Sequence, residues 1–169
     1  NAGILGRQTL FEVTPEEFDR VMAVNVKGCL LCAQAAARVM IEQGIRGRII
    51  NNSSIFAEES HVGVLSYCVS KAAVNRLTRS LAIELRPHGI TVNAIAPGGG
   101  APTSMNAPQH LPQDNTLPDL PPVSPNVPPL ERGATVWDYI GAVLFLASDE
   151  AAYISGDILT IDGGAVSRR

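Results

Sequence analysis

The sequence of 169 residues lacks any cluster of basic side chains. Its two lysines and eleven arginines are scattered along the chain, and the formal net charge is −3. Domains that bind nucleic acid usually gather their positive charge on one face or stripe. We therefore expect no nucleic-acid partner.

Cysteine is also scarce. Cys29, Cys32 and Cys68 are an odd number and form no disulfide framework. Free thiols suit a reducing compartment, so we expect a cytoplasmic protein. Cys29 and Cys32 have the spacing of a redox pair, but they lie within an apolar helical pattern and are interpreted as packing residues.

Three further signals are missing. No signal peptide and no membrane-spanning run is visible, so we expect no membrane association. The run Gly98-Gly99-Gly100 is not followed by the Lys-Ser/Thr pair of a phosphate loop, which excludes that class of NTPase. We also predict no metal site.

What is present is the composition of one globular domain, with 46% hydrophobic and 17% charged residues. A helix is predicted to begin at Thr14-Pro15, with Thr14 as its cap and Glu17 completing a capping box. Its apolar pattern continues to Met40. The pattern fits either two helices in line or one helix bent near Asn25–Gly28.

Strands are predicted at 48–53, 90–96 and 157–161, and further helices at 66–86 and 135–147. This alternation predicts an α/β fold, in which a parallel sheet carries helices on both faces. Ligands of such sheets bind beyond the carboxyl ends of the strands. Ser53, Ser54 and the segment Pro97–Gly100 follow predicted strands and are expected at that edge.

Ser54, Tyr67 and Lys71 form a pattern that fits acid–base chemistry. Tyr67 and Lys71 are four residues apart in a predicted helix and share one face. Lowering the pKa of tyrosine from about 10 to about 7 requires roughly 4 kcal/mol. A cation about 5 Å away supplies roughly 3 kcal/mol at an effective dielectric constant of about 20. Lys71 is therefore predicted to lower the pKa of Tyr67, and Ser54 to hydrogen-bond the oxygen on which Tyr67 acts.

A Tyr-x-x-x-Lys pair is also common as an exposed pair on an amphipathic helix. The spacing to Ser54 and the strand–loop–helix context favour the catalytic interpretation. His61 lies in the loop between Ser54 and Tyr67, and contact with substrate is an open alternative to a solvated position.

The order of motifs along the chain resembles the short-chain dehydrogenase/reductase family. The matching segments are Asn1-Ala2-Gly3, Val24-Asn25-Val26-Lys27-Gly28, Ile49-Ile50-Asn51-Asn52-Ser53-Ser54, Tyr67-Cys68-Val69-Ser70-Lys71, Ile90 to Gly98, and Ser155-Gly156-Asp157 with Asp162-Gly163-Gly164. The resemblance implies a Rossmann-like, doubly wound parallel sheet in three α/β/α layers.

The resemblance also implies roles for the matching residues. Tyr67 is expected to be the general acid/base, and Lys71 to lower its pKa and hold the nicotinamide ribose. Ser54 is expected to fix the substrate carbonyl or alcohol, and Asn25 to anchor a water that relays protons from Lys71. The expected cofactor is NAD or NADP. The residues expected to bind it are Asn1, Ala2, Gly3, Tyr67, Lys71, Pro97, Gly98, Gly99, Gly100 and Thr103.

Part of the family pattern is missing. The opening βαβ unit, with its glycine-rich turn and the residue that selects NAD or NADP, has no counterpart within residues 1–169. We therefore expect residues 1–169 to be the C-terminal two-thirds of a single domain, with an open sheet edge. Thr103 lies six residues after Pro97, whereas the family usually has a threonine five residues after that proline. The resemblance therefore does not fix a contact between Thr103 and the cofactor carboxamide.

The predicted function is an oxidoreductase that interconverts a secondary alcohol and a carbonyl by hydride transfer. The Pro-rich segment 101–130 holds nine of the twelve prolines and is expected to be a substrate lid, with a disordered linker as the alternative. It contains no Lys or Arg, which favours a mostly apolar, uncharged substrate over an acyl thioester on an acidic carrier protein.

The resemblance further implies a homodimer or homotetramer, in which the helices bearing Asn25 and Tyr67 pair between subunits. An alternative function remains open. The chain would then be a non-catalytic fragment that keeps the fold for assembly and binds no cofactor.

Overall fold

The computed structural model describes residues 2–98 and 134–164. The predicted lid 101–130 and four predicted cofactor residues lie outside this part: Asn1, Gly99, Gly100 and Thr103. The elements in chain order are α1 (Pro15–Met22), η1 (Ala23–Lys27), α2 (Gly28–Glu42), β1 (Arg48–Asn52), η2 (Ile55–Ala57), α3 (Leu65–Leu85), η3 (Arg86–His88), β2 (Thr91–Pro97), α4 (Trp137–Ala147), η5 (Asp149–Ala151) and β3 (Ile158–Ile161). The predicted alternation of helices and strands is confirmed.

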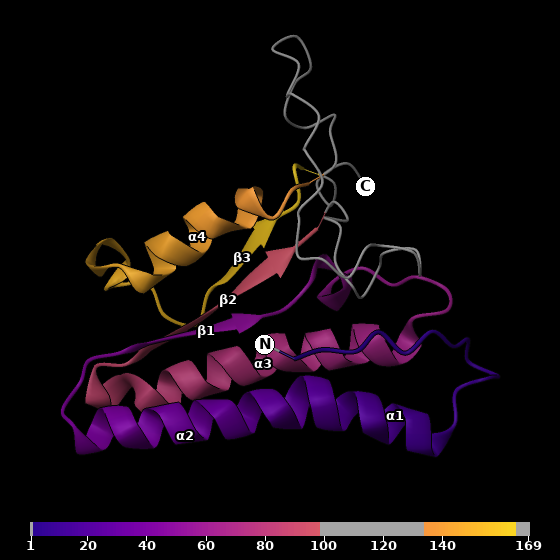
Figure 1. The fold of residues 1–169 in the computed structure, drawn as a ribbon, viewed down its shortest axis with the longest axis horizontal. Helices are drawn as coiled ribbons and strands as arrows, with labels where there is room; N and C mark the ends of the chain where they lie inside the picture. The colour runs from indigo at the N-terminus through magenta and orange to yellow at the C-terminus, as the bar shows by residue number, and fades with distance from the viewer. Residues whose placement is uncertain (1, 99–133, 165–169) are drawn as a thin grey trace, which may run out of the picture.

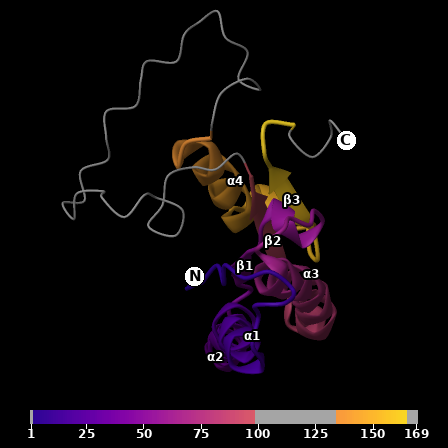
Figure 2. The same ribbon diagram turned by 90° about the vertical axis from the view of Figure 1, so that its right-hand side faces the viewer.

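The three strands form one parallel sheet in the order β1–β2–β3. Figure 1 shows α1, α2 and α3 on one face of this sheet and α4 on the opposite face, and the turned view agrees (Figure 2). The three-layer α/β/α architecture is therefore confirmed for the described residues. Within them, β1 and β3 are the edge strands and β2 is central.

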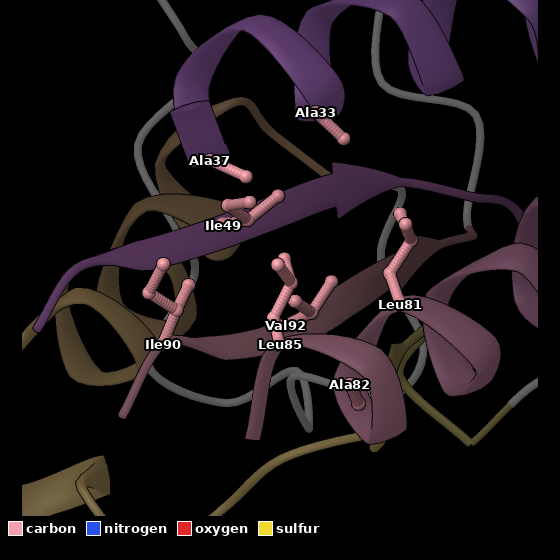
Figure 3. Close-up of a cluster of buried hydrophobic side chains, with 8 residues drawn as sticks. All are labelled: Ala33, Ala37, Ile49, Leu81, Ala82, Leu85, Ile90 and Val92. Carbon is pink, nitrogen blue, oxygen red and sulfur yellow. The ribbon is translucent and has the colours of Figure 1, made fainter. Parts of the chain in front are cut away.

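Side chains that alternate along the strands build a core on each face of the sheet. Ile49 of β1 faces α2 and α3, whereas the next residue, Ile50, faces α4. The larger cluster lies under α2 and α3 (Figure 3), and its members are Ala33, Ala37, Ile49, Leu81, Ala82, Leu85, Ile90 and Val92. Val92 is fully buried, and burial of such a side chain stabilises the fold by roughly 1.5–3 kcal/mol.

The start of α1 follows its local sequence. The Thr14 hydroxyl accepts a hydrogen bond from the Glu17 amide at 3.2 Å, and Pro15 occupies the first helical turn. The Glu17 side chain does not complete the predicted capping box. Its carboxylate instead accepts two hydrogen bonds from the Arg20 guanidinium, each 2.7 Å long.

The bend predicted near Asn25–Gly28 is a π-helical turn. The segment η1 joins α1 to α2 without a break, and the Gly28 amide donates to the carbonyl of Ala23 five residues earlier. Such turns insert one extra residue into a helix and often mark functional sites. The result is a continuous helix in which Asn25 points towards α3 rather than into solvent.

The combined helix Pro15–Glu42 is long and apolar enough to cross a membrane, by length and composition. This differs from the expectation that the chain contains no membrane-spanning run. In the structure its inner side packs on the sheet through Ala33 and Ala37. Core helices of α/β folds meet the same criterion, so this helix is a layer of the fold.

Candidate active site

Ser54, Tyr67 and Lys71 come together where β1 ends and α3 begins. Ser54 lies two residues after β1, and its hydroxyl accepts a hydrogen bond from the Phe56 amide at 3.2 Å. Tyr67 and Lys71 occupy the first two turns of α3 and are only 8% and 6% exposed. The predicted grouping of these three side chains at the carboxyl edge of the sheet is thus present.

Lys71 is held against the end of β1. Its Nζ donates a hydrogen bond to the carbonyl of Asn52 at 2.8 Å and lies 5.5 Å from the centroid of the Tyr67 ring. An ammonium group has three donors, and within the described residues this is the one hydrogen bond that the Lys71 ammonium makes. The remaining donors are available to a ligand with hydroxyl oxygens.

The electrostatics of Tyr67 differ from the sequence prediction. Burial raises the pKa of Tyr67 above its ordinary value, because a phenolate loses hydration there, and the hydrogen bond with Ser54 opposes the increase. Burial likewise lowers the pKa of Lys71, with a smaller opposing effect of the Cys29 thiol. The prediction that Lys71 brings the pKa of Tyr67 down is wrong for this state, since desolvation dominates both groups.

Asn25 lies one layer behind the three converging residues. Its Nδ2 donates to the Ser70 hydroxyl at 2.9 Å, and Ser70 donates to the carbonyl of Tyr67 at 2.8 Å. The same amide exchanges two hydrogen bonds with the backbone of Ile4, at 2.9 and 3.0 Å. Asn25 therefore ties the N-terminal segment to the helix that carries Tyr67.

The hydrogen bonds between Asn25 and Ile4 also fix the position of two predicted cofactor residues. Ala2 and Gly3 directly precede Ile4, and a parallel bridge between Gln8 and Val64 anchors the far end of the segment beside the start of α3. The N-terminal segment runs along α3 in Figure 1. Both residues thus lie on the side of the sheet that carries Tyr67.

Pro97 ends β2, and Gly98 follows it into a crowded position. A Cβ atom on Gly98 would lie 2.6 Å from the Cβ of Asp162 and 3.0 Å from the Ile55 side chain, next to Ser54. Its carbonyl accepts a hydrogen bond of 2.6 Å from the Tyr139 hydroxyl. Only glycine fits at residue 98, in agreement with a backbone that must come close to its neighbours.

Aromatic side chains border Tyr67 in the loop after Ser54. The Phe56 ring lies edge-on to Tyr67 with centroids 6.0 Å apart and contacts the His61 ring at 4.6 Å. His61 also lies 3.4 Å from the Glu59 carboxylate. The Phe56 ring thus lies between His61 and Tyr67 in this chain of ring contacts.

Sequence reasoning did not single out Ser70, Asn75 or Tyr139. Ser70 and Asn75 are buried polar residues of α3, and Asn75 lies four positions after Lys71 on the same helix face. That spacing is a local signal that a closer reading of the helix would have found. Tyr139 contacts Gly98 across 41 residues of chain, and no local signal indicates such a contact.

The described residues fit the nicotinamide end of a dinucleotide. The unused donors of Lys71 and the crowded glycine at residue 98 suit a ligand that lies across the carboxyl ends of β1 and β2. Residues 2–98 and 134–164 contain no glycine-rich turn before a helix, so the phosphate-binding part of such a site is not among them.

Comparisons with known proteins agree with this geometry. A family model described as enoyl-(acyl carrier protein) reductase matches residues 1–166. A 3alpha-hydroxysteroid dehydrogenase from Mediterraneibacter gnavus is 41% identical over 167 residues, which are 99% of this chain and 63% of the relative.

Solved structures give the same result. Acetoin dehydrogenase from Salmonella typhimurium aligns with a TM-score of 0.83 and 35% identity, over 99% of this chain and 63% of that one. Gluconate 5-dehydrogenase from Burkholderia cenocepacia, in complex with NADP and tartrate, aligns with a TM-score of 0.82 and 32% identity, over 99% and 63% of the two chains.

These matches agree in fold and in coverage. The chain spans 63% of the length of the hydroxysteroid dehydrogenase and also 63% of each of the two aligned structures. The match extends over almost the whole chain and includes the strand ends and the helix that carry the candidate site. The chain belongs to the short-chain dehydrogenase/reductase family.

Proposed function

We propose that the protein is an oxidoreductase that interconverts a secondary alcohol and a carbonyl with NAD or NADP. The observation that carries this proposal is the convergence of Ser54, Tyr67 and Lys71 at the carboxyl edge of the sheet, with Lys71 5.5 Å from the Tyr67 ring. The names of the relatives, which are dehydrogenases, support the same class of reaction.

Each side chain has a chemical task in this proposal. Tyr67 gives a proton to the carbonyl oxygen in reduction, or takes it from the alcohol in oxidation. Ser54, hydrogen-bonded to Tyr67, holds the same substrate oxygen and stabilises the charge that develops there. A bound nicotinamide supplies or accepts the hydride.

Lys71 and Asn25 support this proton transfer. The spare donors of Lys71 suit the ribose hydroxyls of the cofactor. Asn25 is proposed to keep the N-terminal segment, with Ala2 and Gly3, beside the cofactor through its bonds to Ile4. The remaining proposed cofactor contacts are Asn1, Pro97, Gly98, Gly99, Gly100 and Thr103.

The proposed substrate is small, mostly apolar and uncharged. The loop between Ser54 and Tyr67 places the Phe56 ring beside Tyr67 and exposes Val62. The same loop carries Glu58 and Glu59 and no Lys or Arg. Two carboxylates in the loop that follows Ser54 disfavour a polyanion such as a coenzyme A thioester.

The test is a nicotinamide absorbance assay with the protein, NAD or NADP, and a panel of secondary alcohols and ketones. Wild type is expected to turn over uncharged members of the panel better than a hydroxyacyl thioester of coenzyme A. The Tyr67→Phe variant removes the transferable proton and is expected to lose at least about 100-fold in kcat, with an unchanged melting temperature. Equal turnover by the two proteins would contradict the role of Tyr67.

The same assay addresses the alternative of a non-catalytic chain. Because the chain spans less than two-thirds of its relatives, binding of NADP is measured directly by calorimetry as well. Absence of both binding and turnover would favour an assembly role. We further propose that the protein is cytoplasmic and associates with a second copy of itself through α2 and α3.

A further inference from the structure

Three consecutive residues at the end of β1 hydrogen-bond residues of α3. The carbonyl of Asn52 accepts from Lys71 at 2.8 Å, the hydroxyl of Ser53 donates to the Oδ1 of Asn75 at 2.5 Å, and Ser54 hydrogen-bonds Tyr67. Only the middle bond joins two residues without a role in the proposed chemistry. Ser53 and Asn75 are each 3% exposed, so water does not compete for this bond.

The orientation of Asn75 is set by its second partner. Its Nδ2 donates to the Glu58 carboxylate at 3.2 Å. An ionised carboxylate only accepts hydrogen bonds, so the amide nitrogen faces Glu58 and the amide oxygen faces Ser53. The Ser53 hydroxyl also lies 3.4 Å from the carbonyl of Lys71, in the preceding turn of α3. Ser53 is thus seated between two successive turns of that helix.

Ser54 depends on its neighbour for its position. Apart from Tyr67, the Ser54 hydroxyl has the Phe56 amide as its partner, which belongs to the same short loop. The backbone beside Ser54 is held by the bond of the Asn52 carbonyl to Lys71 and by the bond of the Ser53 amide to the Ile95 carbonyl of β2 at 2.8 Å. The side-chain bond that joins the adjacent residue to α3 is that of Ser53 to Asn75.

We propose that Ser53 and Asn75 are positioning residues that hold Ser54 at a fixed place relative to the Tyr67 hydroxyl. The inference rests on the proposed function, in which both hydroxyls contact one substrate oxygen. Loss of the Ser53–Asn75 bond lets the end of β1 shift against α3, and a misplacement of about 1 Å costs up to about 100-fold in rate.

A matched pair elsewhere on the same two elements provides the control. Asn51 of β1 donates to the Thr78 hydroxyl of α3 at 2.9 Å, and both residues are buried. This bond also joins β1 to α3, but one helical turn further from Tyr67. If the Ser53–Asn75 bond only stabilised the fold, Thr78→Val and Ser53→Ala would affect the enzyme alike.

The first experiment is a double-mutant cycle on the steady-state rate. We expect Ser53→Ala and Asn75→Ala each to lower kcat about ten- to 100-fold, with KM within about twofold of wild type. The double variant is expected to lose no more than the worse single variant, because both remove one bond. Ser53→Thr keeps the hydroxyl and should retain most of the rate. Thr78→Val should lower the melting temperature and leave kcat unchanged.

The second experiment does not need turnover. Titration of tyrosine labelled with ¹³C at Cζ, with Tyr67 assigned by the Tyr67→Phe variant, follows the pKa of Tyr67 by NMR. Because the bond with Ser54 lowers that pKa, Ser53→Ala and Asn75→Ala should raise it further, and Thr78→Val should not.

The outcomes separate the two proposals. A wild-type protein without turnover contradicts the proposed function, and the titration still tests the positioning role. Additive losses in the cycle, or kcat and pKa values of Ser53→Ala and Asn75→Ala that match those of Thr78→Val, would overturn the positioning role.

Discussion

At the scale of single residues, Tyr67 shows how burial and hydrogen bonding compete. Desolvation raises the pKa of Tyr67, and the bond with Ser54 lowers it by less. The charge and spacing of Lys71, taken alone, predict the opposite direction. The extent of burial depends on how α3 packs against the N-terminal segment and the loop after β1, which residue spacing does not encode.

The raised pKa of Tyr67 predicts a difference between the two reaction directions. Carbonyl reduction needs the protonated phenol, so its rate should stay level around neutral pH and fall only as pH rises through the raised pKa. Alcohol oxidation needs the phenolate, so its rate should increase with pH over the same alkaline range. Rate profiles in both directions measure this. An oxidation rate that is flat from about pH 7 to about pH 10 would contradict it.

The same shift has a consequence for stability. The folded pKa of Tyr67 lies above the unfolded value, so its contribution is fully present below the unfolded pKa. It is lost as pH rises through the folded pKa, because the unfolded tyrosine ionises first. The Tyr67→Phe variant should therefore lose less stability than wild type at alkaline pH.

Among the elements, the π-helical turn η1 orients the Asn25 side chain towards its hydrogen-bond partners. Asn25 lies within this turn, and its side chain hydrogen-bonds both Ile4 and Ser70. The apolar pattern of the sequence indicated a bend there but left two helices in line as an alternative. The structure has one continuous helix. Within it Asn25 hydrogen-bonds Ile4 and Ser70, which lie 21 and 45 residues away in the sequence.

Replacement of Asn25 tests this linkage. Asn25→Ala leaves the Ile4 amide and the Ile4 carbonyl without their partner, at a cost of about 1–3 kcal/mol for each group that stays buried. The Ser70 hydroxyl loses one of its two bonds and keeps the one to the Tyr67 carbonyl. We expect a lower melting temperature and faster amide hydrogen exchange at Ile4, measured by NMR or mass spectrometry.

The control is Asn52→Ala, because the contact of Asn52 with Lys71 uses the backbone carbonyl and survives the substitution. Its exposed side chain is expected to matter little. Unchanged exchange at Ile4 in Asn25→Ala would show that the N-terminal segment is held by other contacts.

At the scale of the whole molecule, the helices of the α1–α3 layer carry apolar side chains on their outer faces. Leu31 and Val39 of α2 are 56% and 49% exposed, and Val69 and Ile83 of α3 are 42% and 64% exposed. Leu31 and Val39 are about two helical turns apart, and Val69 and Ile83 about four, so each pair shares a face. Exposed apolar patches of this kind suit protein–protein contact.

The proposed self-association follows from these faces. The double variant Leu31→Arg, Ile83→Arg places a charge on each helix and is expected to be monomeric by size-exclusion chromatography with light scattering, whereas wild type is a dimer or tetramer. Tyr153→Arg changes a fully exposed side chain after α4 and should leave the assembly intact. A monomeric wild type would rule out the proposal.

Three features were predictable from the amino-acid sequence alone: the alternation of helices and strands, the parallel α/β class, and the grouping of Ser54, Tyr67 and Lys71. These follow from short-range periodicity, caps and the rule that parallel strands end at one edge. The folded chain was needed to find the direction of the Tyr67 pKa shift, the partners of Asn25 and the bond of Ser53 to Asn75. Each of these depends on burial and on side chains far apart in the chain, and such contacts form only when the helices pack on the sheet.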